Sequence, residues 1–149
     1  MNYTVDITTV TGQLIAASRK RTAYGRVSQE IQPLLGYVWT FLRAHPELKW
    51  GFNVALYHEL PPHGSIECGV QVFSPFDETA DVVSSYTPAG RVATTAHFGR
   101  YGQLGAAHSA VVEFCKQNGH EIVLPFWEIY GHWNDDWAKV RTDVYYLIK

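Results

Sequence analysis

The order of secondary-structure signals repeats once along the chain, and this duplication restricts the fold more than any other feature of the sequence. The pattern strand, helix, strand, strand runs from Gln13 to Phe73 and again from Gly90 to Ile148. Apolar residues recur with a helical period in the helical segments, whereas the flanking segments are rich in β-branched and aromatic residues. We therefore predict an α+β fold in which duplicated strand-helix-strand-strand modules form one antiparallel sheet with two main helices and a pseudo-two-fold axis.

Length and composition suit one compact domain. The 149 residues are 46% hydrophobic, and we assign residues 1–149 to a single domain with pseudo-repeats of about 1–86 and 87–149. The net charge of −2 offers no basic surface, so we expect no direct nucleic acid binding. No apolar run is long enough for a membrane span, and Cys68 and Cys115 lack metal-ligand spacing. We expect a cytoplasmic monomer or homodimer with reduced thiols.

Local signals predict where the two helices begin and end. The first helix has its apolar face on Val27–Leu42, with Ser28 as N-cap, and Pro33 predicts either a later start or a kink. The second helix lies within Tyr101–Asn118 and ends before Gly119, because glycine suits the left-handed conformation that follows many helices.

Four shorter segments are expected to be extended or turned. Tyr3–Val10 and Val82–Tyr86 are predicted to be further strands, since their apolar and polar residues alternate. Leu60–Gly64 contains two prolines and is predicted to be a loop. Gly69 lies inside a predicted strand, where a glycine indicates a bulge.

The segment Pro125–Trp133 is the strongest candidate for a ligand site. Side chains alternate between the faces of a strand, so Glu128, Tyr130 and His132 are expected on the same face. A lone carboxylate among aromatic rings is costly to bury unless a cation or hydrogen-bond donors meet it. The segment therefore predicts the floor of a pocket.

The repeat indicates that only one half of the chain carries this acid. Aligning the two halves places Tyr57 at the position of Tyr130, whereas Glu128 corresponds to Ala55. A charge kept in only one half of a duplicated fold indicates an asymmetric site. The alternative is a glutamate with a purely structural, hydrogen-bonded role.

Three motifs follow one another in the second half of the chain: Gly90–Leu104, which contains an H-x-G-x-Y element, then Glu128-Ile129-Tyr130, and Arg141–Leu147. Together they resemble the GyrI-like family, the effector-binding domain of bacterial multidrug-responsive transcription regulators. The resemblance extends over essentially the whole chain and is sharpest from Gly90 onward. It implies the duplicated fold predicted above, together with a cavity for cationic, flat, hydrophobic guests.

The resemblance implies a stand-alone protein that binds a small hydrophobic, cationic or aromatic molecule. No helix-turn-helix segment is expected, so DNA binding would require a separate chain. Glu128 would complement the charge of the guest, and aromatic rings would stack on it. The predicted ligand-binding residues are Glu128, Tyr130, Tyr57, Trp39, Phe98 and Tyr145.

Two other functions found in the same family stay open. In a cofactor-independent hydrolase that opens cyclopropane-bearing alkylating natural products, Glu128 would be the general base and Tyr57 or Tyr130 would polarise the electrophile. In a protein inhibitor of the DNA gyrase inhibitor type, the acidic Asp77-Glu78 loop would be the contact surface. The seven histidines have no metal-ligand spacing, so we expect neither a metal nor a cofactor.

Overall fold

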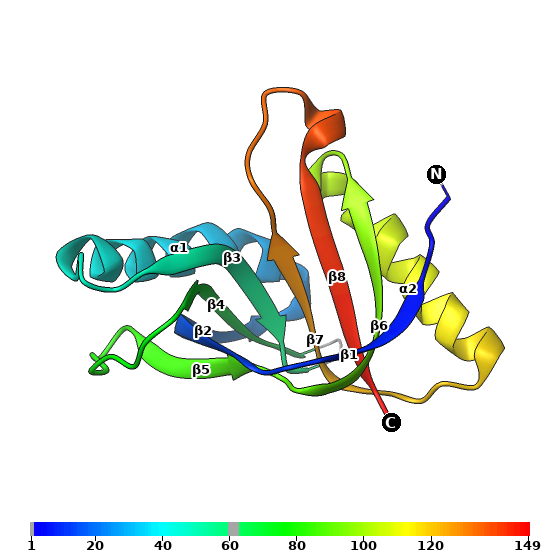
Figure 1. Ribbon diagram of the computed structural model, residues 1–149, viewed down its shortest axis with the longest axis horizontal. Coiled ribbons are helices and arrows are strands. Elements are labelled where there is room, and N and C mark those ends of the chain that lie inside the picture. Colours follow the sequence, from blue (N-terminus) through cyan, green and yellow to red (C-terminus); the bar gives the residue numbers. More distant parts are fainter. Residues whose placement is uncertain (1, 60–62) are drawn as a thin grey trace.

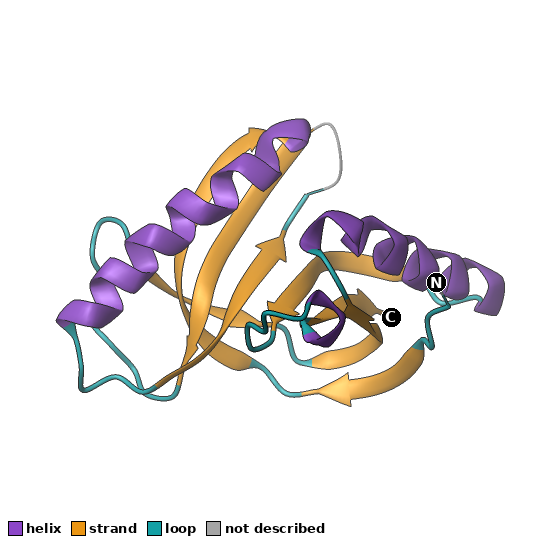
Figure 2. Cartoon of the chain, turned by 90° about the horizontal axis from the view of Figure 1, so that it is seen from above, coloured by secondary structure: helices purple, strands orange, loops and turns teal. Residues whose placement is uncertain are grey.

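One curved antiparallel sheet carries both main helices on the same face (Figures 1 and 2). The structure is a computed structural model that describes residues 2–59 and 63–149. Its strands are β1 Asp6–Val10, β2 Gln13–Ala23, β3 Trp50–Tyr57, β4 His63–Val72, β5 Val83–Thr87, β6 Gly90–Phe98, β7 Ile122–Tyr130 and β8 Arg141–Ile148. Its helices are α1 Val27–Ala44 and α2 Leu104–Asn118, with the 3-10 turns η1 Tyr24–Arg26, η2 Tyr101–Gln103 and η3 Trp137–Lys139.

The strand order shows the duplication. Across the sheet the strands lie in the order β1-β6-β8-β7-β3-β4-β2-β5. The modules β2-α1-β3-β4 and β6-α2-β7-β8 meet where β3 pairs with β7. The strand that precedes each module in the chain pairs with the first strand of the other module. Thus β1 pairs with β6, and β5 pairs with β2. The predicted α+β fold is confirmed.

The register of β3 and β7 locates the pseudo-two-fold axis. Ala55 lies opposite Glu128, and Tyr57 lies opposite Phe126. A two-fold axis through an antiparallel residue pair exchanges positions that follow each member by the same number of residues. An axis through the pair Ala55 and Glu128 therefore makes Tyr57 equivalent to Tyr130, as the repeat predicted.

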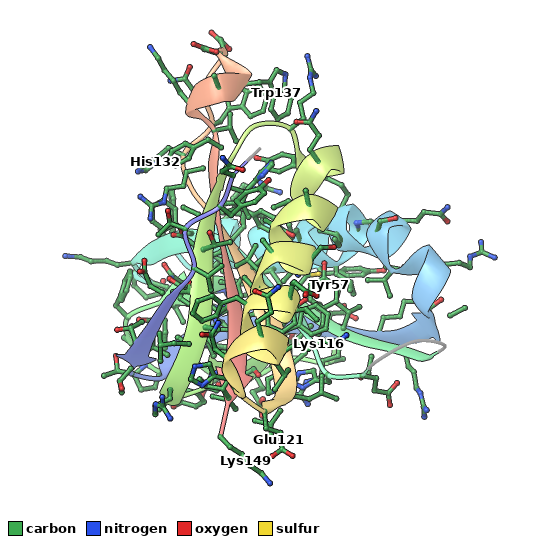
Figure 3. The ribbon with its side chains drawn as sticks, turned by 90° about the vertical axis from the view of Figure 1, so that its right-hand side faces the viewer. Tyr57, Lys116, Glu121, His132, Trp137 and Lys149 are labelled. Carbon is green, nitrogen blue, oxygen red and sulfur yellow. The ribbon has the colours of Figure 1, made fainter. Side chains whose placement is uncertain are left out.

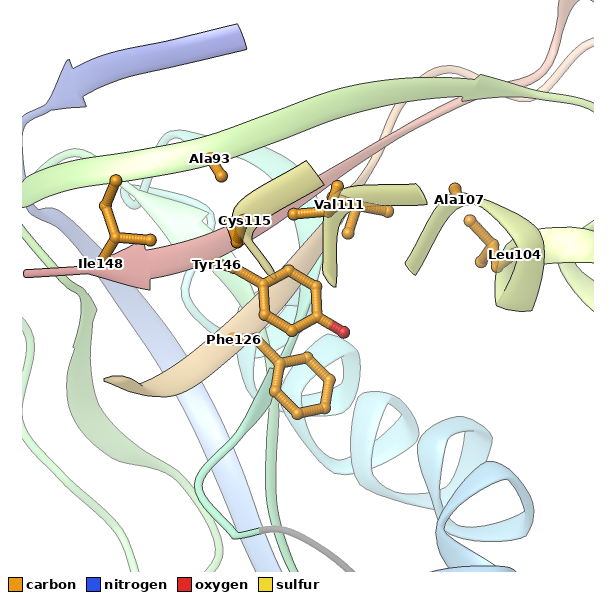
Figure 4. Packing of buried hydrophobic residues seen from close by; sticks show 9 residues of the cluster. Ala93, Leu104, Ala107, Val111, Cys115, Phe126, Tyr146 and Ile148 are labelled. Carbon is orange, nitrogen blue, oxygen red and sulfur yellow. The ribbon is translucent and has the colours of Figure 1, made fainter. Parts of the chain in front are cut away.

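Each helix covers the core of its own module. α2 buries Leu104, Ala107, Val111 and Cys115 against strand residues that include Phe126, Val144 and Tyr146 (Figure 4). α1 buries Val38, Phe41 and Leu42 against Ala16, Val70 and Val72. On the opposite face, the curvature of the sheet brings together Ile15, Ala17, Val54, Leu56, Val92 and Trp127.

The helix boundaries differ from expectation at the start of α1. The helix begins at Val27 with Arg26 as its cap residue and without a side-chain cap hydrogen bond, so the N-cap role of Ser28 was wrong. It continues through Pro33, which is exposed, to Ala44. α2 ends as predicted, since Gly119 has a φ of 71° and its N–H bonds the carbonyl of Cys115.

Several strand predictions need correction. Gly69 pairs regularly with Ala17 and Val54, so the predicted bulge there was wrong. The irregularity lies between Trp50 and Asn53, where β3 pairs with β4. β7 ends at Tyr130, so His132 lies beyond the strand. The predicted loop Leu60–Gly64 lies outside the described residues at 60–62, and β4 begins at His63. Among the described helices, none is long and apolar enough to cross a membrane.

Candidate functional site

A cavity of about 720 Å³ lies between the starts of the two helices and the central strands. The first module supplies Gly25, Val27, Ser28, Ile31, Gln32, Leu35, Asn53 and Tyr57 to its walls. The second module supplies Tyr101, Gly102, Leu104, Gly105, His108, Phe126, Glu128, Tyr130 and Tyr146. Both modules thus build the cavity, which lies at the pseudo-two-fold axis.

Glu128 is the acid of this cavity, and three side chains form hydrogen bonds with its carboxylate. Its residue surface is only 5% exposed. The hydroxyls of Tyr57 and Tyr130 both donate to Oε1, at 3.0 and 2.5 Å. Nε2 of His108 lies 2.7 Å from Oε2. These bonds compensate for the lost hydration of the buried carboxylate without a lysine or arginine among the described wall residues.

His108 connects the acid to the far wall of the cavity. Its Nδ1 lies 2.7 Å from the hydroxyl of Tyr146, while Nε2 faces Glu128. A neutral imidazole that carries its hydrogen on Nε2 satisfies both contacts, because Nδ1 then accepts from the tyrosine. The side chain is 19% exposed, so it lies at the cavity surface rather than deep in the core.

Aromatic rings form a continuous stack along one side of the cavity. Tyr57 stacks on Phe126 with ring centroids 4.8 Å apart, and Phe126 stacks on Tyr146 at the same spacing (Figure 4). Tyr57 comes from β3 and lies between the two helices (Figure 3). Tyr101 meets the ring of Tyr130 edge-on at 5.7 Å. The rings offer faces and edges to an apolar guest.

The electrostatic surroundings keep the neighbouring hydroxyl and thiol groups protonated. Burial and the charge of Glu128 raise the pKa of Tyr130 well above its ordinary value, so its hydroxyl remains a donor. Burial, with the charges of Glu128 and Glu67, raises the pKa of Cys68 to about 12. The starts of α1 and α2 also border the cavity, and their positive dipole ends attract the carboxylate.

The structure brings three of the six predicted ligand-binding residues to the cavity, namely Glu128, Tyr130 and Tyr57. The catalytic roles considered for these same three residues stay predictions. Their geometry places two phenols and one imidazole on a single carboxylate.

The other three predicted residues lie elsewhere. Nε1 of Trp39 donates to Oδ1 of Asn53 at 2.9 Å, so this indole bonds to a wall residue but is not itself part of the wall. Phe98 is 46% exposed at the end of β6. Tyr145 belongs to the opposite face of the sheet, where it stacks on Trp127 with centroids 5.3 Å apart.

Four wall residues that carry a ring were missed, namely His108, Phe126, Tyr146 and Tyr101. Alternation along β7 could have found Phe126, which lies two residues before Glu128 and therefore on the same face. The signal for His108 was a titratable ring in the apolar stripe of a helix. Tyr146 could not be distinguished from Tyr145 until the strand register was known.

No protein-family model and no curated protein matches this chain. Solved structures share its fold over nearly its whole length. The crystal structure of the EcmrR C-terminal domain superposes with a TM-score of 0.82 at 21% identity, covering 100% of this chain and 99% of that chain. The structure of SAV2435 bound to tetraphenylphosphonium gives a TM-score of 0.67 at 16% identity, with coverage of 100% and 94%. A hydrolase from Listeria innocua gives 0.59 at 9% identity, with coverage of 97% and 91%.

Because these identities are low, the likeness establishes the fold alone. It agrees with the architecture expected from the GyrI-like resemblance, in which two strand-helix-strand-strand modules share one sheet.

Proposed function

We propose that this chain binds small molecules in the manner of GyrI-like effector-binding domains, and that its cavity takes an apolar, aromatic cation. One observation carries the proposal. A buried carboxylate, Glu128, lies in a cavity walled by aromatic and aliphatic side chains. Support comes from the shared fold of the EcmrR C-terminal domain and of SAV2435, whose structure holds tetraphenylphosphonium.

The size and lining of the cavity suit such a guest. Ligand sites commonly have volumes of roughly 300–1,000 Å³ and are mostly apolar with a few placed polar groups. The cavity of about 720 Å³ lies within this range. A cation over an aromatic face gains about 0.5–2 kcal/mol depending on how far it is desolvated. The stacked rings of Tyr57, Phe126 and Tyr146 provide this contact beside the acid.

The hydrogen bonds of Glu128 favour a cation without many donors of its own. Oε1 already accepts from two tyrosines, and Oε2 faces His108. A guest with several N–H groups would have to compete with these contacts. A guest whose charge is shielded by rings is attracted through space and leaves the hydrogen bonds intact.

Calorimetric titration with tetraphenylphosphonium tests the proposal at pH 7.5. Glu128→Gln keeps the shape of the side chain and removes its charge, so we expect the affinity for the cation to fall about 10- to 100-fold, equal to about 1.4–2.8 kcal/mol. Glu113→Gln is the control, because this acid is exposed on α2 and bonds Gln117. Equal affinity in wild type and Glu128→Gln would refute the role of the carboxylate, and absence of binding by wild type would refute the proposed guest class.

A further inference from the structure

Among the described residues that line the cavity, His108 carries the one imidazole and Glu128 the one carboxylate. They face each other at 2.7 Å. The strands otherwise place tyrosine hydroxyls here, from Tyr57, Tyr130 and Tyr146, and η2 adds Tyr101. The wall residues of α1 are Val27, Ser28, Ile31, Gln32 and Leu35, which do not titrate.

The phenols of Tyr130 and Tyr101 and the thiol of Cys68 stay uncharged at neutral pH. Burial and Glu128 raise the pKa of Tyr130 well above its ordinary value, and burial raises that of Tyr101. Cys68, which lies on β4 opposite Ala55, has its pKa raised to about 12 by burial and by the charges of Glu128 and Glu67. The dipoles of the two helix starts do not depend on pH.

Neither His108 nor Glu128 has a titratable counterpart at the equivalent position of the other module. The turns η1 and η2 lead directly into α1 and α2, so Val27 corresponds to Leu104. Four residues further into each helix, Ile31 corresponds to His108. Ala55 corresponds to Glu128 across the axis. The duplicated scaffold thus differs between its halves at an acid and at the imidazole that contacts it.

The protonation of His108 changes the charge that a guest meets. With a neutral imidazole, the cavity holds the single negative charge of Glu128. With a protonated imidazole, the two charges form an ion pair at 2.7 Å, and the net charge of the wall is zero. Both forms retain their contacts, because Nδ1 can accept from Tyr146 or donate to its oxygen.

We propose that His108 determines the specificity of this cavity for charge: the neutral form selects aromatic cations, and the protonated form accepts uncharged aromatic molecules without preference for cations. The inference rests on the proposed function, since it concerns the same site. A bound cation and the imidazole proton compete for the same carboxylate. By reciprocity, a bound cation expels that proton to the same degree that the proton weakens cation binding.

The test compares two guests of similar shape in calorimetric titrations from pH 5.0 to 8.0 at constant ionic strength. Tetraphenylphosphonium is permanently charged, and triphenylphosphine oxide is neutral. We expect the affinity for the phosphonium to rise at least 10-fold across this range, with a limiting slope of 10-fold per pH unit, and the affinity for the oxide to change less than 2-fold. A phosphonium affinity that is constant with pH would overturn the inference.

Two variants assign the effect to the residue. His108→Gln can still donate to Glu128 and does not titrate, so the phosphonium affinity should become constant with pH. His120→Gln, two residues after α2 and outside the cavity, should keep the wild-type slope. Retention of the slope in His108→Gln would contradict the assignment.

A measurement on wild type keeps the inference testable if His108→Gln does not fold. The number of protons released on binding of tetraphenylphosphonium at pH 6.0 follows from titrations in buffers of different ionisation enthalpy. We expect net release for the phosphonium and none for the oxide, and nitrogen NMR of the imidazole should show the same deprotonation. Binding of the phosphonium without proton release would overturn the inference but leave the proposed function standing. Failure of the phosphonium to bind at any pH would refute both.

Discussion

Tyr57 and Tyr130, which occupy equivalent positions in the two modules, donate their hydroxyls to the same oxygen atom of Glu128 at 3.0 and 2.5 Å. The duplicated scaffold therefore presents a symmetric pair of phenols to an asymmetric acid. Because Glu128 lies on the axis opposite Ala55, one carboxylate can satisfy both hydroxyls. The same acid that we propose as the charge complement of a guest thus also joins β3 to β7.

Removal of either hydroxyl should lower the free energy of unfolding. Hydrogen bonds to charged groups contribute about 1.5–3 kcal/mol, and we expect losses of this size for Tyr57→Phe and Tyr130→Phe in urea unfolding. Because the two hydroxyls share an acceptor, the loss in the double variant should differ from the sum of the single losses by at least about 0.5 kcal/mol. Tyr37→Phe is the control, since Tyr37 is 53% exposed. Additive losses would show that the shared oxygen does not couple the two modules.

Gly69→Ala should destabilise the fold, because β2 passes close to this residue of β4. An added Cβ would lie 3.1 Å from the carbonyl carbon of Ala16 and from Cα of Ala17, and closer still to the carbonyl oxygen of Ala16. Overpacking of this kind costs about 1–3 kcal/mol, and thermal unfolding should show the loss.

A second glycine serves as the control for that substitution. Gly36 lies inside α1, where an added Cβ meets nothing within 4 Å. Gly36→Ala should therefore raise the free energy of unfolding by about 0.5–1 kcal/mol, because alanine has the higher helix propensity. A loss of stability in Gly69→Ala beside a gain in Gly36→Ala would support close strand packing, and a neutral Gly69→Ala would contradict it.

Glu67 should make stability depend on pH in the acid range. Burial would raise its pKa, but hydrogen bonds from His58, Arg19 and Ser85 outweigh burial and bring the pKa from 4.5 to about 2. A pKa that is lower in the folded state gives stability that is fully present above about pH 4.5 and is lost as the pH falls toward 2. By linkage this amounts to roughly 3 kcal/mol at pH 7.

Urea unfolding of Glu67→Gln tests that dependence. The variant should be less stable than wild type at pH 7, and the difference should shrink steadily between pH 4.5 and pH 2.5. Glu113→Gln removes an exposed acid and should show neither effect. A difference that stays constant with pH would assign the loss to packing rather than to charge.

Periodicity was sufficient to predict the fold, because both modules carry clear helical stripes and strand alternation. The alignment of Tyr57 with Tyr130 also gave the position of the pseudo-two-fold axis, which the β3–β7 register confirms. The exchange of β1 and β5 between modules could not be predicted, since it depends on long-range pairing. A local pattern predicts that a segment is extended but does not identify its partner strand.

The candidate site was predictable only where a residue and its face were both fixed by a single strand. Glu128 and Tyr130 lie two residues apart on β7, and the prediction that they share a face was correct. Tyr145 and Tyr146 are adjacent on β8, and a shift of one residue places the opposite ring in the cavity. His108 could not be recognised as a site residue, because its partners Glu128 and Tyr146 come from distant segments.

The position of a bound guest tests the central claim most directly. Tetraphenylarsonium has the shape and charge of the phosphonium, and its arsenic atom gives an anomalous signal in X-ray diffraction. In a crystal of the complex, we predict an anomalous peak in the cavity between the starts of α1 and α2, beside the Glu128 carboxylate and the stacked rings of Tyr57 and Phe126. A peak at another surface, with this cavity empty, would contradict the account.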